Sequence, residues 1–255
     1  MGLLEGRKAL IAGVANDHSI AWGIAQAFRR EGARLAFSYG AENLERRVRP
    51  LAESLGVELV NRCDVGNDEE IAHLFGEIRE MWGDLDIVVH SVAFAQRDDL
   101  KNRYIDTPRA GFHLALDVSS YSLVALARAA EPLLNEGGAL LTLTYYGSEK
   151  VLPNYNVMGV AKAALEASVR YLSWDLGARG VRVNAISAGP VRTLSSAAVS
   201  GFKDMLRYQA ERSPLRRNIT TAEVGNTAVF LCSPLSSGIT GEVVHVDAGY
   251  NVVGA

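Results

Sequence analysis

Two hydrophobic patterns alternate along the chain from end to end. Short runs rich in Val, Ile, Leu and Ala begin at residues 8, 34, 57, 86, 139, 181 and 242. Because these runs are apolar at nearly every position, they are typical of parallel strands covered on both faces. Segments of helical length lie between them, at 19–30, 67–82, 109–134, 154–176 and 221–232. The pattern predicts an α/β fold, a doubly wound parallel sheet flanked by helices on both faces.

The chain shows no sign of a division into domains. It has no Pro/Gly/Ser-rich linker, internal repeat or low-complexity tract, so residues 1–255 are predicted to form a single domain. Two less regular segments, 94–108 and 189–214, each follow a strand end. Ligands of open α/β sheets bind outside the carboxyl ends of the strands, so these segments are candidate binding loops. The alternative is that both segments are ordinary surface loops without a role in binding.

Composition and charge narrow the class of protein. The chain has 26 Lys+Arg and 29 Asp+Glu, a net charge of −3, and 48% hydrophobic residues. This balance is typical of a globular protein and argues against a nucleic-acid partner. No apolar run approaches the ~20 residues that span a bilayer, and the N-terminus lacks the pattern of a signal peptide. The two cysteines are expected to be free thiols in a reducing compartment. We therefore expect a cytoplasmic protein without a membrane partner.

Glycine at the end of the first predicted strand indicates a dinucleotide site. Gly13 permits a sharp turn, and Ser19 is placed to cap the next helix, whose N-terminus would attract a pyrophosphate. The G-x-G-x-x-G fingerprint is incomplete, because only Gly13 and Gly23 are present, and a purely structural turn is the alternative. Gly40 stands near where an acidic residue often binds the adenosine ribose, which leaves the choice between NADH and NADPH open. Asp64, after the third strand, would bind adenine or cap a helix.

Tyr155 and Lys162 are the candidate catalytic pair. They lie seven residues apart in a predicted helix, within ~20° of one face and about 10 Å along the axis. A phenol and an ammonium so placed would bracket a ribose and the reacting ends of cofactor and substrate. Most such pairs, however, have no chemical role. Metal-ligand motifs, a G-x-S-x-G elbow and a P-loop are all absent, so no metal site is expected and hydrolase and NTPase functions lose support.

Longer sequence strings place the pair in context. The segments GRKALIAGVANDHSIAWGIA, DIVVHSVAFA, PNYNVMGVAKAALEASVRYL, GVRVNAISAGPVRTL and GEVVHVDAG span nearly the whole chain. They resemble the short-chain dehydrogenase/reductase superfamily, and within it the enoyl-(acyl-carrier-protein) reductases of bacterial fatty-acid synthesis. The Tyr-x6-Lys spacing separates this branch from the Tyr-x3-Lys reductases. Those would need Lys at Gly159 and Ser at Thr142.

The resemblance implies a reaction and roles for residues. The expected reaction is reduction of the trans-2 double bond of an enoyl-acyl-carrier-protein thioester by NADH, with NADPH as the alternative cofactor, in the last step of the elongation cycle. Tyr155 would donate a hydrogen bond to the thioester carbonyl, Lys162 would hold the nicotinamide ribose, and Tyr145 matches a second active-site tyrosine. A reductase acting on another alkene or ketone, and a non-catalytic NAD(H) sensor, remain alternatives.

The implied binding residues surround this pair. The predicted cofactor-binding residues are Gly13, Ser19, Ile20, Gly40, Asp64, Val65, Val92, Lys162, Val191, Arg192, Thr193, Leu194 and Ser195. The predicted substrate-binding residues are Ala95, Tyr145, Tyr155, Met158, Val199 and Phe202, and a substrate-binding loop is expected over about 191–208.

Partners follow from the resemblance and from the surface pattern. An acidic acyl-carrier protein would be steered by a basic group, the residues Lys203, Arg207, Arg212, Arg216 and Arg217. The segments 109–134 and 154–176 are apolar on most sides, so we expect them to pair between subunits. The resemblance suggests a homotetramer.

Overall fold

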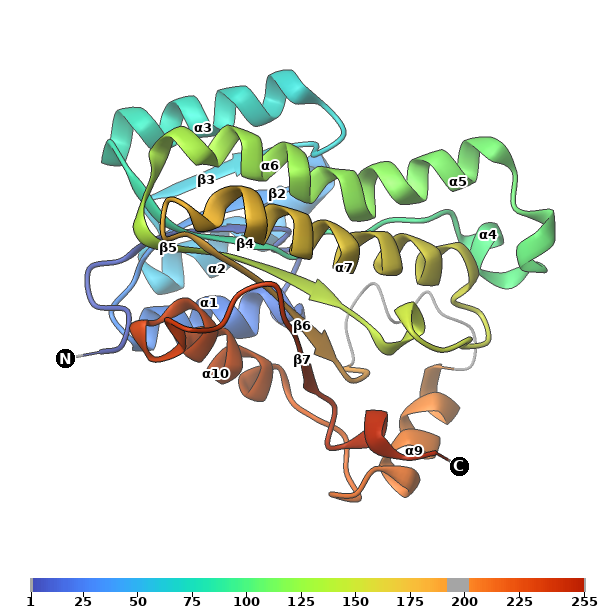
Figure 1. Ribbon diagram of the computed structural model, residues 1–255. Coiled ribbons are helices and arrows are strands. Elements are labelled where there is room, and N and C mark those ends of the chain that lie inside the picture. Colours follow the sequence, from blue (N-terminus) through green and yellow to red (C-terminus); the bar gives the residue numbers. More distant parts are fainter. Residues whose placement is uncertain (1, 192–201, 255) are drawn as a thin grey trace.

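A seven-stranded, all-parallel sheet forms the centre of the protein (Figure 1). The structure, a computed structural model, describes residues 2–191 and 202–254. The strand order is β3-β2-β1-β4-β5-β6-β7, so the winding direction reverses between β1 and β4. The predicted doubly wound fold is therefore confirmed. The strands are β1 (Lys8–Ala12), β2 (Arg34–Tyr39), β3 (Leu59–Arg62), β4 (Leu85–His90), β5 (Leu134–Thr144), β6 (Arg182–Ala188) and β7 (Val243–Val246).

Helices cover both faces of the sheet, and three more lie toward the carboxyl ends of the strands (Figure 1). One face carries α1 (Ile20–Arg30), α2 (Glu45–Leu55) and α10 (Thr221–Cys232). The other carries α3 (Asp68–Trp82), α6 (Ser122–Ala130) and α7 (Asn156–Gly177). Beyond the strands lie α4 (Arg97–Lys101), α5 (Arg109–Leu116) and α9 (Phe202–Arg212). Single 3-10 turns occupy Glu42–Leu44, Tyr104–Asp106, Glu131–Leu133, Tyr146–Ser148, Pro234–Ser236 and Tyr250–Val252, and Asp117–Tyr121 is π-helical.

Side-chain caps explain where three of the helices begin. Ser19 Oγ accepts a hydrogen bond from the Trp22 amide at the start of α1, and Asn67 caps α3 in the same way. Thr220 and Glu223 form a reciprocal capping box at α10. Each cap satisfies N–H groups that have no partner within the helix. These local signals explain why the predicted starts lie within a residue of the observed ones.

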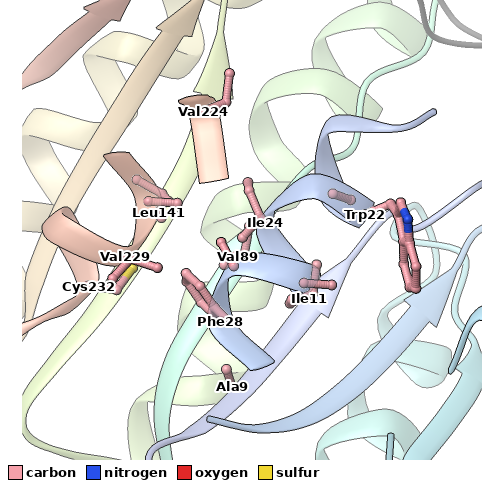
Figure 2. Close-up of a cluster of buried hydrophobic side chains, with 14 of the residues drawn as sticks. Ala9, Ile11, Trp22, Ile24, Phe28, Val89, Leu141, Val224, Val229 and Cys232 are labelled. Carbon is pink, nitrogen blue, oxygen red and sulfur yellow. The ribbon is translucent and has the colours of Figure 1, made fainter. Parts of the chain in front are cut away.

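The core between the sheet and α1 and α10 is closely packed (Figure 2). Phe28 and Ile24 of α1 are fully buried within this cluster, and Val229 of α10 is buried beside them. The two helices approach closely at their glycines, because a Cβ added to Gly225 would lie 2.6 Å from the carbonyl oxygen of Gly23. A Cβ on Gly23 would in turn lie 2.6 Å from Thr221 Cβ at the start of α10, so Gly23 is required for helix packing and is not part of the glycine turn.

Two segments differ from their predicted form. In the described part of the chain, the stretch Arg109–Leu133 is the one helical run whose length and composition would suit a membrane span. The prediction that no stretch has this length and composition was therefore wrong. Half of the most apolar window of Arg109–Leu133 is buried inside the protein, and core helices can also have this length and composition. The predicted substrate loop 191–208 becomes helix α9 at Phe202. Five predicted cofactor or substrate residues lie outside the described residues: Arg192, Thr193, Leu194, Ser195 and Val199.

Candidate active site

The carboxyl ends of the strands bring most of the predicted site residues to one edge of the sheet. Since every strand pair is parallel, residues that follow successive strands emerge on the same side. The switch point between β1 and β4 lies within this edge, where ligands of such sheets bind. The residues that follow β1 to β6 in turn are Gly13, Gly40, Asp64 with Val65, Val92, Tyr145 and Val191.

The turn after β1 can be made only by glycine. Gly13 has φ 99°, and its amide donates to the carbonyl of Ser38 over 2.9 Å. A Cβ at this position would lie 2.2 Å from the carbonyl oxygen of Ser91, which follows β4. The backbone therefore passes between the ends of β2 and β4 before α1 begins at Ile20. The capped N-terminus of α1 points its positive dipole end at this turn, which fits a pyrophosphate.

The adenosine end of the predicted site is open. Gly40 is exposed, and no heavy atom lies within 4 Å of a Cβ built on it. Asp64 is also exposed, and its Oδ1 accepts a hydrogen bond from the Gly66 amide over 3.0 Å. The alternative that Asp64 caps the following helix was wrong, because Asn67 caps α3. Val65 is buried beside it.

Tyr155 lies immediately before α7 and not within it. Asn154 and Asn156 have positive φ values, 63° and 36°, so the helix begins two residues later than predicted. The premise that Tyr155 and Lys162 share a helix was therefore wrong, because Tyr155 is the residue that precedes the first turn of α7. The Tyr155 ring is positioned by its surroundings: a Cβ on Gly147 would lie 2.3 Å from Tyr155 Cδ1. The Tyr155 ring also meets the ring of Tyr145, edge to face, with centroids 5.1 Å apart.

Both tyrosine side chains are held as neutral phenols. Burial raises the pKa of Tyr155, and the nearby Tyr145 and Glu166 act in the same direction. Burial likewise raises the pKa of Tyr145, whose hydroxyl lies 3.6 Å from Met205 Sδ of α9. A phenol that stays protonated across the physiological range is a hydrogen-bond donor and not a general base.

Lys162 is a buried ammonium on the first half of α7. Its side chain packs into the protein, with the residue 6% exposed, and Nζ donates to the carbonyl of Leu143 over 2.7 Å. Burial lowers the pKa of Lys162 to about 8, and the carboxylate of Glu166 acts in the opposite direction. The lysine thus reaches the end of β5, two residues before Tyr145.

His90, at the end of β4, is a buried neutral imidazole next to this lysine. Burial and the charge of Lys162 lower its pKa to about 3. Ser122 Oγ donates to the Val118 carbonyl, so it accepts from His90 Nε2–H over 2.8 Å. Nδ1 lies 2.7 Å from Thr142 Oγ1, which donates to it. Thr142 is therefore bound to His90 and fully buried, and it is not a substitute for the serine of a Ser-Tyr-Lys site.

The remaining predicted residues lie around this group. Met158, in the first turn of α7, is buried, and Ala95 is half-buried in the segment between β4 and α4. Phe202 is the first residue of α9, and its side chain lies outside the description. Sequence reasoning missed His90, Thr144 and Glu166 as parts of the site. The spacing of Glu166, one helical turn after Lys162, was the available signal.

Fold and site together define a nicotinamide-dinucleotide-dependent oxidoreductase of the short-chain dehydrogenase/reductase type. The family model described as "Enoyl-(Acyl carrier protein) reductase" matches residues 13–251. The chain belongs to this family.

Individual relatives agree over the full length. An enoyl-(acyl-carrier-protein) reductase (NADH) of Rickettsia felis is 54% identical, covering 100% of this chain and 98% of that protein. The Anaplasma phagocytophilum reductase, solved in complex with NAD, is 54% identical with a TM-score of 0.96 over 100% of this chain and 97% of that one. The Bacillus cereus reductase, solved with NADP+ and indole naphthyridinone, is 55% identical with a TM-score of 0.98 over 100% of both chains. The predicted enzyme class, reaction and nicotinamide cofactor are confirmed.

Proposed function

We propose that Tyr155 provides the main transition-state contact in the reduction of an enoyl thioester bound at the end of β5. When bound, the reduced nicotinamide supplies a hydride to the β-carbon of the substrate. Negative charge then gathers on the thioester oxygen, and the Tyr155 hydroxyl donates a hydrogen bond to it. The observation that carries this role is the buried, protonated phenol of Tyr155 packed edge to face on Tyr145. Tyr145 and Met158 would line the part of the site that holds the acyl chain of the substrate.

Lys162 would bind the ribose next to the nicotinamide. Its ammonium has three donors, and one of them is engaged by the Leu143 carbonyl. The residues available to the rest of a dinucleotide are those of the sheet edge, with the glycine turn and the α1 N-terminus at the phosphates. The narrow turn at Gly13 and the open space at Gly40 both fit such a ligand. We propose NADH as the cofactor, with NADPH as the alternative.

A direct assay separates this reaction from its nearest rivals. Loss of absorbance at 340 nm is expected with crotonyl thioester and NADH, and little or none with acetoacetyl thioester. Lys162→Ala should weaken dinucleotide binding, measured by NADH fluorescence, as well as turnover. Lys162→Arg, which keeps the charge and the donors, should retain much of the binding. A Lys162→Ala variant that binds and turns over like the parent would contradict the assigned role.

The carrier protein is proposed to dock next to α9. Met205 of α9 contacts Tyr145, which supports placing this helix beside the site. Arg207 is exposed, and among the described residues it pairs with the exposed Asp204 at 3.5 Å, an ion pair weak enough to exchange for another carboxylate. Arg212 and Arg217 are less available, because Arg212 stacks on Tyr208 and Arg217 pairs with Glu223 at 2.7 Å. The Lys203 side chain lies outside the description.

We also propose that the protein is a cytoplasmic homo-oligomer with one domain per chain. Helix α7 carries an apolar stripe with steps of four and three residues: Val160, Ala164, Ala167, Tyr171 and Trp174. Tyr171 and Trp174 are 77% and 85% exposed in the single chain. A stripe of this kind is the usual seam between paired helices. A tetramer is the state suggested by the resemblance.

A further inference from the structure

Three consecutive residues of β5 engage three buried polar side chains. Thr142 Oγ1 contacts His90, the Leu143 carbonyl accepts from Lys162, and Thr144 Oγ1 donates to Glu166 Oε1 over 2.5 Å. Lys162 and Glu166 therefore reach neighbouring residues of the same strand from successive turns of α7. The end of β5 sets the distance between the ammonium and the carboxylate.

A glutamate at position 166 is expected to lower the stability of the folded protein, because its carboxyl group is buried. It is 9% exposed, and in the described part of the chain no cation lies within 4.0 Å of its carboxyl group. Burying a carboxylate without a direct ion pair costs stability unless its charge acts on something nearby. The groups that face Lys162 are Glu166, on the same helix, and His90, on β4. His90 is neutral. Among the described residues, the charge that acts on Lys162 is therefore that of Glu166.

We propose that Glu166, anchored by Thr144, is a positioning residue that keeps the Lys162 side chain protonated and directed at the end of β5. The proposal deepens the role assigned above to Lys162 and rests on it for its consequence in dinucleotide binding. Burial alone favours the neutral amine, and the carboxylate one turn away opposes that effect. The ammonium then keeps its full set of donors at neutral pH for the ribose hydroxyls.

The titration of Lys162 tests this directly. The chain contains only five lysines, so protein labelled with 13C-lysine gives few Cε signals, and Lys162→Arg identifies the one of interest. Glu166→Gln keeps the shape and an oxygen acceptor for Thr144 but removes the charge. We expect the titration midpoint of Lys162 to fall by about one pH unit or more in Glu166→Gln. The pH at which NADH affinity is lost should fall by a similar amount.

Matched variants separate charge from packing. Thr144→Val disturbs the same contact but keeps the carboxylate, so its shift should be much smaller than that of Glu166→Gln. In a Lys162→Arg background, Glu166→Gln should leave the pH dependence of NADH binding unchanged, because guanidinium does not titrate there. An unchanged Lys162 midpoint in folded Glu166→Gln, or an equal shift in Thr144→Val, would overturn the proposal. Normal NADH binding by Lys162→Ala would instead overturn the role of the lysine, and the midpoint measurement would still decide that of Glu166.

Discussion

The ring of Tyr155 meets the ring of Tyr145 edge to face, with centroids 5.1 Å apart and planes inclined by 80°. Such pairs stabilise their geometry beyond the burial of apolar area. The contact joins the end of β5, which Tyr145 follows, to the start of α7, which Tyr155 precedes. It fixes the Tyr155 ring by packing, so the hydroxyl is left to interact with substrate.

Tyr155→Phe removes the hydroxyl and keeps this packing. We expect kcat to fall about 10²–10³-fold, the usual effect of losing one oxyanion donor, with little change in NADH affinity. Stopped-flow or steady-state turnover of crotonyl thioester, followed at 340 nm, measures kcat. NADH fluorescence measures the NADH affinity. Tyr145→Phe, which removes the hydroxyl that contacts Met205, serves as the comparison and should cost less activity than Tyr155→Phe. A Tyr155→Phe enzyme with parental kcat would contradict the donor role.

The fold could be predicted because its signals are local. Apolar runs mark the strands, and caps such as Ser19 and Thr220 mark the helix starts within a few residues. Alternation of the two elements then leaves few topologies for a parallel sheet. Gly23 shows the limit of such reasoning, since its close contact with Gly225 joins residues some 200 positions apart in the sequence.

The geometry of the site depends on features that local patterns do not carry. Spacing identified Tyr155 and Lys162 as candidates, but the positive φ of Asn154 and Asn156 removes Tyr155 from the helix. The neutral state of His90 depends on its burial and on the charge of Lys162, which lies 72 residues away in the sequence. Such contacts follow only from the tertiary structure.

Gly13→Ala tests the glycine turn. The positive φ and the 2.2 Å approach to the Ser91 carbonyl leave no room for a methyl group. We expect a loss of about 3 kcal/mol or more in the free energy of unfolding, together with loss of NADH binding. Gly76→Ala is the control, because Gly76 lies in α3 with open space around it. That change should stabilise the protein by about 0.5–1 kcal/mol. Urea denaturation measures the free energy of unfolding of both variants. Similar changes in Gly13→Ala and Gly76→Ala would argue against a strained turn.

The lysine buried beside the site makes stability depend on pH. The pKa of Lys162 falls from 10.5 to about 8 on folding. Between these values the unfolded chain binds a proton that the folded chain does not, so raising the pH favours the folded state. The parent should therefore gain roughly 2 kcal/mol between pH 8 and pH 10 relative to Lys162→Met, which has no titrating group there. Urea denaturation across this range measures it, and a constant difference between the two proteins would refute the shifted pKa.

The exposed stripe of α7 predicts how assembly can be disrupted. Trp174→Asp places a charge in the proposed seam, so light scattering at micromolar concentration should give a smaller mass than that of the parent. Ile105→Asp is the control: Ile105 is 76% exposed but belongs to the turn Tyr104–Asp106 and not to the apolar stripe of α7. A parent that is already monomeric at this concentration would remove the proposed assembly. Parental mass for Trp174→Asp would place the interface elsewhere.

Helix α9 predicts a difference between carrier-linked and free substrates. Reversing the charges of Lys203 and Arg207 to Glu would oppose the approach of an acidic carrier protein, because complementary charge mainly speeds encounter and sets register. We expect KM for the carrier-linked enoyl substrate to rise about tenfold, with the effect reduced at high salt, where exposed charges are screened. KM for the corresponding coenzyme A thioester should stay near the parental value. Arg79→Glu reverses another exposed helical arginine, on α3, and should change neither. Equal losses with both substrates would mean that these charges act on the enzyme itself, and docking next to α9 would have to be abandoned.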